Sequence, residues 1–246
     1  MDKVDLSDAN EKLARARDHI AETERRIKIL IDPDFYKVVV HRDPGARQVS
    51  IQLISRAQPD KKIQATIGDA ISNVRSALDY ISVALVAPIT GKPRDAGFPF
   101  ADDAKGFAGV VAKGSLAVCS QSVRDFFIDE VQAYRCGKGH ALWTLNKLRN
   151  IDKHRFLVTT LHMLGIRGSW KIGSVVMSDC ELGIEEGQDK RVLLCPDNIE
   201  FTTPLRATLE VCFKEPPHVP GTSVLKFLNN AARTTQSILE SLERIT

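Results

Sequence analysis

The N-terminal part of the chain follows a helical pattern of apolar positions. Leu6, Leu13, Ile20 and Ile27 recur every seven residues, and charged side chains fill many of the positions between them. A repeat of this length places the four side chains on one side of a helix, which we predict over about residues 7–30. Because the apolar stripe is narrow, this helix could pack either on the rest of the protein or on a second copy.

A strand-like pattern and a second helical pattern follow. Residues 36–41 and 49–53 flank the turn-forming residues 43–45, and the second run alternates with period two, so we predict a β-hairpin. Apolar side chains spaced three and four residues apart then predict a helix over about residues 64–86. Its buried stripe consists of Ile67, Ile71, Val74, Leu78, Ile81 and Leu85.

The second half of the chain changes from helical to strand-like patterns. A loop over residues 88–101 precedes helical patterns at about 102–112 and 120–133, and a further helix is predicted over about 140–153. A last helix begins near Thr222 or Ser223 and continues to the C-terminus. Between these helices lie four strand-like runs, at 155–163, 169–178, 191–195 and 205–214.

These elements predict a single-domain α+β protein over residues 1–246. We expect a helical bundle core with long terminal helices, formed by about residues 1–154 and 221–246. An antiparallel, strand-rich insertion is expected over about residues 155–214, in addition to the early hairpin. No internal repeat and no long linker divides the sequence.

Composition limits the kind of protein that this can be. Hydrophobic residues make up 43% of the chain and charged residues 26%, as in soluble globular proteins. The 34 basic and 31 acidic side chains leave a net charge of +3, which excludes a surface that is basic throughout. No apolar run approaches the roughly 18 residues of a membrane span. The polar first eight residues lack the apolar region of a signal peptide, so we expect a cytoplasmic protein with no membrane partner.

The sequence holds no recognisable metal or cofactor motif. Its five cysteines are scattered and form no C-x-x-C pair, and the nearest metal-like spacing is that of Cys136 and His140. Walker A, G-x-S-x-G, H-E-x-x-H and G-x-G-x-x-G motifs are also absent from it. We therefore predict no metal, no cofactor and reduced thiols.

The helix predicted over residues 140–153 has a charged residue on its apolar side. On a helical wheel, Asp152 falls in the middle of the apolar arc, and Arg149 lies at the edge of that arc. The arc consists of Ala141, Leu142, Leu145, Leu148 and Ile151, and Trp143, Lys147, Asn150 and His154 lie opposite. An aspartate aimed into a core is costly unless it is paired.

The second helix offers partners for this aspartate. Arg75 and Asp79 are one turn apart at the flank of its apolar stripe. We therefore predict a structural ion-pair network of Arg75, Asp79 and Asp152, in which Arg149 also takes part. In this interpretation His154 does no chemistry and caps the C-terminal end of its helix, where a cationic group is favoured.

Three segments of the chain resemble one known family. They are Ile67–Tyr80, which reads IGDAISNVRSALDY, the Phe98–Phe100 loop, and Leu148–Arg155, which reads LRNIDKHR. In this order they resemble a family of uncharacterised bacterial cytoplasmic proteins, over about residues 60–165. That resemblance implies no particular activity.

The segment Arg149-Asn150-x-x-x-His154 also resembles the R-x(4–6)-H motif of the HEPN superfamily. This resemblance implies a helical-bundle protein that interacts with RNA or a nucleotide, and a homodimeric, metal-independent endoribonuclease of a bacterial stress or defence system. His154 would then be the acid and base, Arg149 would stabilise the phosphate, and Asn150 would orient either group. The flanking cations Lys147, Lys153 and Arg155 would contact RNA phosphates.

Two interpretations remain open on the sequence alone. The R-x(4–6)-H pattern also occurs at residues 135–140 and 155–162, so the motif is weak by itself. A non-catalytic interaction or sensor module, in which the same residues form only ion pairs, is the alternative to an RNA-cleaving enzyme. Residues 147–155 carry a net charge of +3, equal to that of the whole chain, so a phosphate site is expected there if anywhere.

Overall fold

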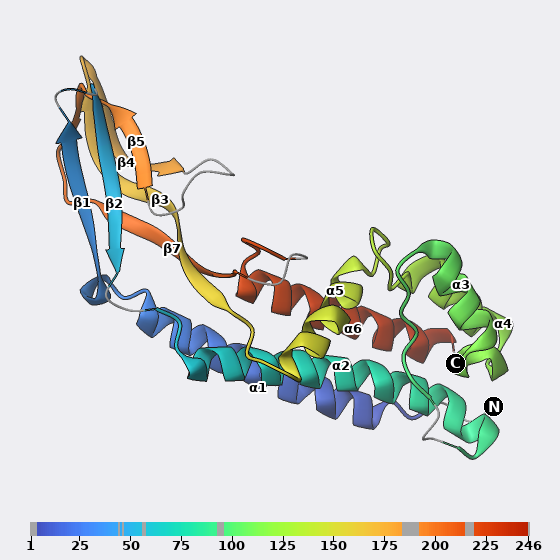
Figure 1. Ribbon diagram of the computed structural model, residues 1–246. Coiled ribbons are helices and arrows are strands. Elements are labelled where there is room, and N and C mark those ends of the chain that lie inside the picture. Colours follow the sequence, from blue (N-terminus) through green and yellow to red (C-terminus); the bar gives the residue numbers. More distant parts are fainter. Residues whose placement is uncertain are drawn as a thin grey trace.

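The computed structural model describes residues 4–43, 45, 47–55, 58–92, 96–183, 192–214 and 219–245. Figure 1 shows an elongated molecule in which helices form a long body and strands form an arm that projects from one end of it. Both termini lie at the end of the body away from the arm. The mixture of helices and antiparallel sheets confirms the predicted α+β fold class.

Three long helices run along the body: α1 (Ser7–Leu30), α2 (Lys61–Thr90) and α6 (Val224–Ile245). The seven-residue stripe of α1 packs on α2 and α6, with Leu13 and Ile20 buried in that contact surface. The side chain of Asp60 accepts a hydrogen bond from Ile63 N at 2.9 Å and so caps the start of α2. Gly91, at a positive φ of 66°, ends it.

Shorter helices complete the body. They are α3 (Ala104–Lys113), α4 (Gln121–Phe126) and α5 (His140–Asp152). Short 3-10 turns occupy Pro33–Phe35 and Ser115–Val118, and a π-helical turn over Phe127–Val131 continues α4. Helix α5 lies against both α2 and α6.

The arm consists of two antiparallel sheets. In the first, β1 (Tyr36–Asp43), β2 (Gln48–Ser55) and β5 (Val192–Pro196) lie in that order. In the second, β3 (Thr159–Ile172) pairs on one side with β4 (Val175–Gly183). On its other side β3 pairs with β6 (Ile199–Phe201) and β7 (Arg206–Phe213). Because β2 pairs with β5, the early hairpin belongs to the arm.

The inner faces of the two sheets bury a common core. Ile51 of β2 and Ile166 and Trp170 of β3 are almost completely buried. Arg42 joins β1 to the segment before β6, because its guanidinium donates to the carbonyl oxygens of Asp197 and Ile199 at 3.0 and 2.6 Å. The arm is therefore a small packed unit, joined to the body through β1 and β2, which lie between α1 and α2 in the sequence, and through β3 and β7 (Figure 1).

Some element boundaries differ from those predicted. Helix α2 is longer at both ends than predicted. The predicted strand-like runs at 155–163 and 169–178 are replaced by β3 and β4, and a turn near Gly173 separates these two strands. Gly165 and Gly168, which separate two of the predicted strand-like runs, lie inside β3 beside two register shifts. A Cβ atom on Gly165 would lie 2.7 Å from Leu182 O, and one on Gly168 would lie 2.8 Å from a Leu205 methyl group. Pro44 and Arg191 of the predicted turn and strand lie outside the described residues.

Candidate functional site at the end of helix α5

Helix α5 crosses α2 in the antiparallel direction, and two contacts define the crossing. Near the start of α2, the Asp152 carboxylate lies against Gly68, where a Cβ atom would be only 2.5 Å from Oδ2. Two turns later on α2, Arg75 Nε donates to Asn146 Oδ1 at 3.0 Å. The chain beyond Asp152 therefore leads toward the N-terminal end of α2.

Arg75 is the centre of a structural cluster. It forms the predicted ion pair with Asp79, and its guanidinium lies 4.7 Å from the centre of the Phe100 ring. Asp79 in turn accepts a hydrogen bond from Phe98 N at 3.1 Å. These contacts attach the Phe98–Phe100 loop to α2 and α5, which explains why these three segments of the sequence belong together.

The predicted contact between Asp152 and Arg75 is replaced by a different one. Arg75 points to Asp79 and Asn146, whereas Asp152 lies beside Gly68, seven residues or about 10 Å earlier on α2. Desolvation raises the pKa of the half-buried Asp152 carboxyl above its usual range, and the neighbouring Asp69 raises it further. Arg149 opposes both effects. The residues of the predicted network thus form two separate groups, Arg75 with Asp79 and Asp152 with Arg149.

The three residues of the R-x(4–6)-H pattern lie at the end of α5. Arg149 is half-buried, and its buried Nε finds no hydrogen-bond partner among the described residues. Asn150 and His154 are exposed. His154 lies in the turn two residues beyond Asp152, the last residue of α5, and its N–H bonds to Ile151 O at 3.0 Å. Arg149 is therefore inside the helix and His154 outside it.

The flanking cations divide into two groups. Lys153 and Arg155 are exposed on either side of His154. Lys147 instead bonds to Asp102 Oδ1 at 2.9 Å, which also accepts from Trp143 Nε1 at 2.9 Å. These two hydrogen bonds hold the pKa of the Asp102 carboxyl below its usual range. Lys147 therefore attaches the 101–103 segment to α5, a role that differs from the predicted phosphate contact.

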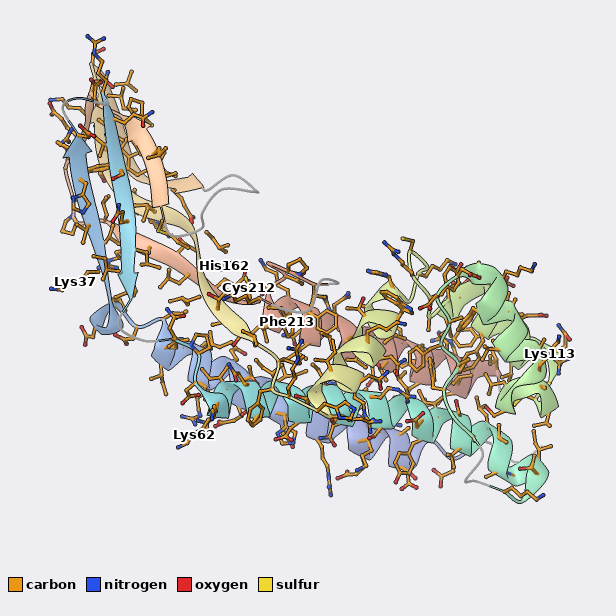
Figure 2. The ribbon with its side chains drawn as sticks, viewed as in Figure 1. Lys37, Lys62, Lys113, His162, Cys212 and Phe213 are labelled. Carbon is orange, nitrogen blue, oxygen red and sulfur yellow. The ribbon has the colours of Figure 1, made fainter. Side chains whose placement is uncertain are left out.

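Two further lysines extend the positive charge beyond α5. Lys61 and Lys62 are exposed at the start of α2, toward which the chain leads after Asp152. Figure 2 shows Lys62 at this end of α2, away from α3 and α4. Sequence reasoning missed both residues, because only the antiparallel crossing places them near the end of α5. We call Lys61, Lys62, Lys153, His154 and Arg155 the basic surface.

The other two R-x(4–6)-H matches lie in different surroundings. In the first, the His140 ring stacks on Trp143 with 5.6 Å between ring centres, and its Nδ1 accepts from Cys136 N at 3.3 Å. That contact also accounts for the metal-like Cys136 and His140 spacing. In the second, His162 lies within strand β3. Within the described part of the chain, no three potential metal ligands gather at one place.

Comparison with known proteins yields no relative. No family model, no curated protein and no solved structure matches this chain. Among the described residues, no helix is both long and apolar enough to cross a membrane.

Proposed function

We propose that the end of α5 binds RNA phosphates and that His154 cleaves RNA there without a metal ion. The observation that carries the proposal is the exposure of His154 between two exposed cations, Lys153 and Arg155, at the end of the helix that holds Arg149. Lys61 and Lys62 support it, because they are exposed cations at the end of α2 toward which the chain leads after Asp152.

The proposed reaction needs an acid–base group and a cation. An imidazole exchanges protons near neutral pH, so His154 would take the proton of the ribose 2′-hydroxyl or give one to the leaving oxygen. Arg149 would stabilise the charge on the phosphate, and Asn150 would orient either group. The buried Arg149 Nε has no hydrogen-bond partner among the described residues, although Asp152 interacts electrostatically with the same guanidinium.

A homodimer would complete this arrangement. Because Arg149 is half-buried within α5 whereas His154 is exposed in the turn beyond it, one residue of the pair is best supplied by a second copy. Two α5 ends that face each other across a two-fold axis would place Arg149 of one chain beside His154 of the other. The proposal therefore predicts that cleavage requires association of two chains.

The test is RNA cleavage in the presence of EDTA, with a set of single- and double-stranded substrates. We expect His154→Ala and Arg149→Ala to lower the cleavage rate by about 10²- to 10⁴-fold while the fold is retained. His41→Ala removes an exposed histidine of β1 in the arm and is the matched control. Equal rates for wild type and H154A would refute the catalytic role.

A non-catalytic module is the second candidate, and one observation favours it. Arg149, one turn away on the same helix, lowers the pKa of Asp152, and an electrostatic interaction of this kind is expected of a structural role. If wild type binds RNA or a nucleotide through the basic surface and cleaves none of the substrates, this candidate takes precedence. The same samples decide between the two.

A further inference from the structure

A second candidate site lies at the end of the body away from the arm, between α4 and the C-terminal half of α6 (Figure 1). It is a pocket of about 190 Å³. Its lining consists of Phe126, Glu130, Val131, Lys138, Thr234, Ser237, Ile238 and Ser241. Since a water molecule occupies about 30 Å³ in the liquid, the pocket has room for one small metabolite.

One wall of the pocket is built from unusual backbone. The π-helical turn Phe127–Val131 ends at Gln132, which has a positive φ of 46°. The following loop folds so tightly that a Cβ atom on Gly139 would lie 2.3 Å from Val131 O, and one on Gly137 would lie 2.4 Å from Gln132 O. Backbone of this kind is costly and is concentrated at functional sites. Here it fixes the position of Lys138.

Lys138 and Glu130 form an ion pair at the rim of the pocket. Lys138 Nζ lies 2.9 Å from Glu130 Oε2 and donates to Asp129 O at 2.8 Å. The Lys138 N–H donates to Gln132 Oε1 at 3.3 Å, which holds the backbone beneath it. Both charged side chains are more than half exposed, at 56% and 60%. An exposed pair of this kind contributes little to stability, so a ligand can replace it at small cost.

The opposite wall is neutral, and the floor is apolar. Thr234, Ser237 and Ser241 present hydroxyl groups from one face of α6, because they are spaced by three and four residues. Buried Val131 and Ile238 and half-buried Phe126 form the apolar part. The pocket thus offers one carboxylate, one ammonium group, hydroxyl groups and an apolar surface.

We propose that this pocket binds a free apolar α-amino acid such as leucine. Lys138 would bind the carboxylate of the amino acid, and Glu130 would bind its ammonium group. The ion pair between Lys138 and Glu130 would thus be replaced by two ion pairs with the ligand. The Thr234 hydroxyl already donates to Asn230 O at 2.9 Å, so the Ser237 hydroxyl would donate to the carboxylate. The side chain would lie on Phe126, Val131 and Ile238. Glu130 would repel a simple anion and Lys138 would repel a simple cation, so only a zwitterion pairs with both charges.

The test is calorimetric titration of the whole chain with L-leucine and two blocked analogues, N-acetyl-L-leucine and L-leucinamide. The analogues lack one charge each, and we expect both to bind at least tenfold more weakly than L-leucine. Lys138→Gln and Glu130→Gln should each weaken L-leucine binding at least tenfold. Lys113→Gln, at the exposed C-terminal end of α3, is the control and should leave the affinity unchanged.

Three results would overturn the proposal. The first is no binding of L-leucine or L-phenylalanine at millimolar concentration by a folded protein. The second is equal affinity for L-leucine and one blocked analogue, which would indicate a plain anion or cation site. The third is unchanged affinity in both variants. Because the pocket shares no residue with the basic surface, none of these results depends on RNA cleavage.

Discussion

At the residue scale, Gly68 provides the space in which the Asp152 carboxylate lies. Replacing Gly68 by Ala would place a Cβ atom 2.5 Å from Oδ2, so we expect G68A to lose about 1–3 kcal/mol of unfolding free energy. Gly109→Ala is the matched control, because Gly109 also lies in a helix and a Cβ atom there meets nothing within 4 Å. G109A should gain up to about 1 kcal/mol.

Urea unfolding measures both effects, and a double variant identifies their origin. If the clash with Asp152 causes the loss, then removal of that carboxylate in G68A/D152A should restore much of the stability. A G68A variant as stable as G109A would show that α2 and α5 are not this close at Gly68.

The raised pKa of Asp152 predicts a pH dependence of stability. Its pKa is higher in the folded than in the unfolded state, so the folded protein binds the proton more tightly. Stability relative to Asp152→Asn should therefore fall as the pH rises from the ordinary carboxylate pKa through the raised one, and then level off. We expect D152N to be the more stable protein at pH 7 and to lose that advantage at low pH. Unfolding free energies of both proteins from pH 3.5 to 7.5 test this, and a constant difference would contradict it.

At the element scale, Arg75 connects α2, α5 and the Phe98–Phe100 loop. A lysine at this position keeps the charge but cannot donate from Nε to Asn146, pair with Asp79 and stack on Phe100 at once. We expect Arg75→Lys to lose roughly 1–3 kcal/mol of unfolding free energy, measured by urea unfolding. Arg17→Lys, an exposed arginine of α1 that bonds to Gln236 at 3.1 Å, is the control and should change little. Equal stability of both variants would refute this role.

The elements that the sequence predicts best are those with long regular patterns. The apolar stripes of α1 and α2 need only local spacing, and the structure has both helices. Gly165 and Gly168 misled the strand boundaries, because glycine marks a turn or a bulge equally well. The π-helical turn after α4 has no pattern of its own.

The candidate site was predictable only in part, for a physical reason. The wheel places Asp152 on the apolar side of α5, but its partner depends on where α5 crosses α2, which no local pattern determines. For the same reason the local pattern around Lys147 does not indicate its ion pair with Asp102, 45 residues earlier. Lys61 and Lys62 join the basic surface only through that crossing.

At the scale of the whole molecule, the net charge of +3 is small, so RNA binding should depend on one region. Four cations of the basic surface, Lys61, Lys62, Lys153 and Arg155, are exposed, and we expect each to contact one phosphate. For single-stranded RNA, four phosphate contacts predict a slope of roughly −3 for log K against log salt concentration. Lys61→Gln/Lys62→Gln should make that slope about 1.4 units less steep.

The comparison that decides this uses a second pair of lysines. Lys105 and Lys113 are exposed on α3, at the other end of the body, and their replacement by Gln changes the total charge by the same amount. If RNA binds at the basic surface, only the α2 pair changes the slope, whereas equal changes in both variants would mean that RNA responds to total charge alone. Lys61 and Lys62 are not part of the proposed chemistry, so saturating RNA should restore the cleavage rate of that variant to the wild-type value. A rate that stays low at saturation would place the two lysines in the reaction itself and would contradict their assignment to binding.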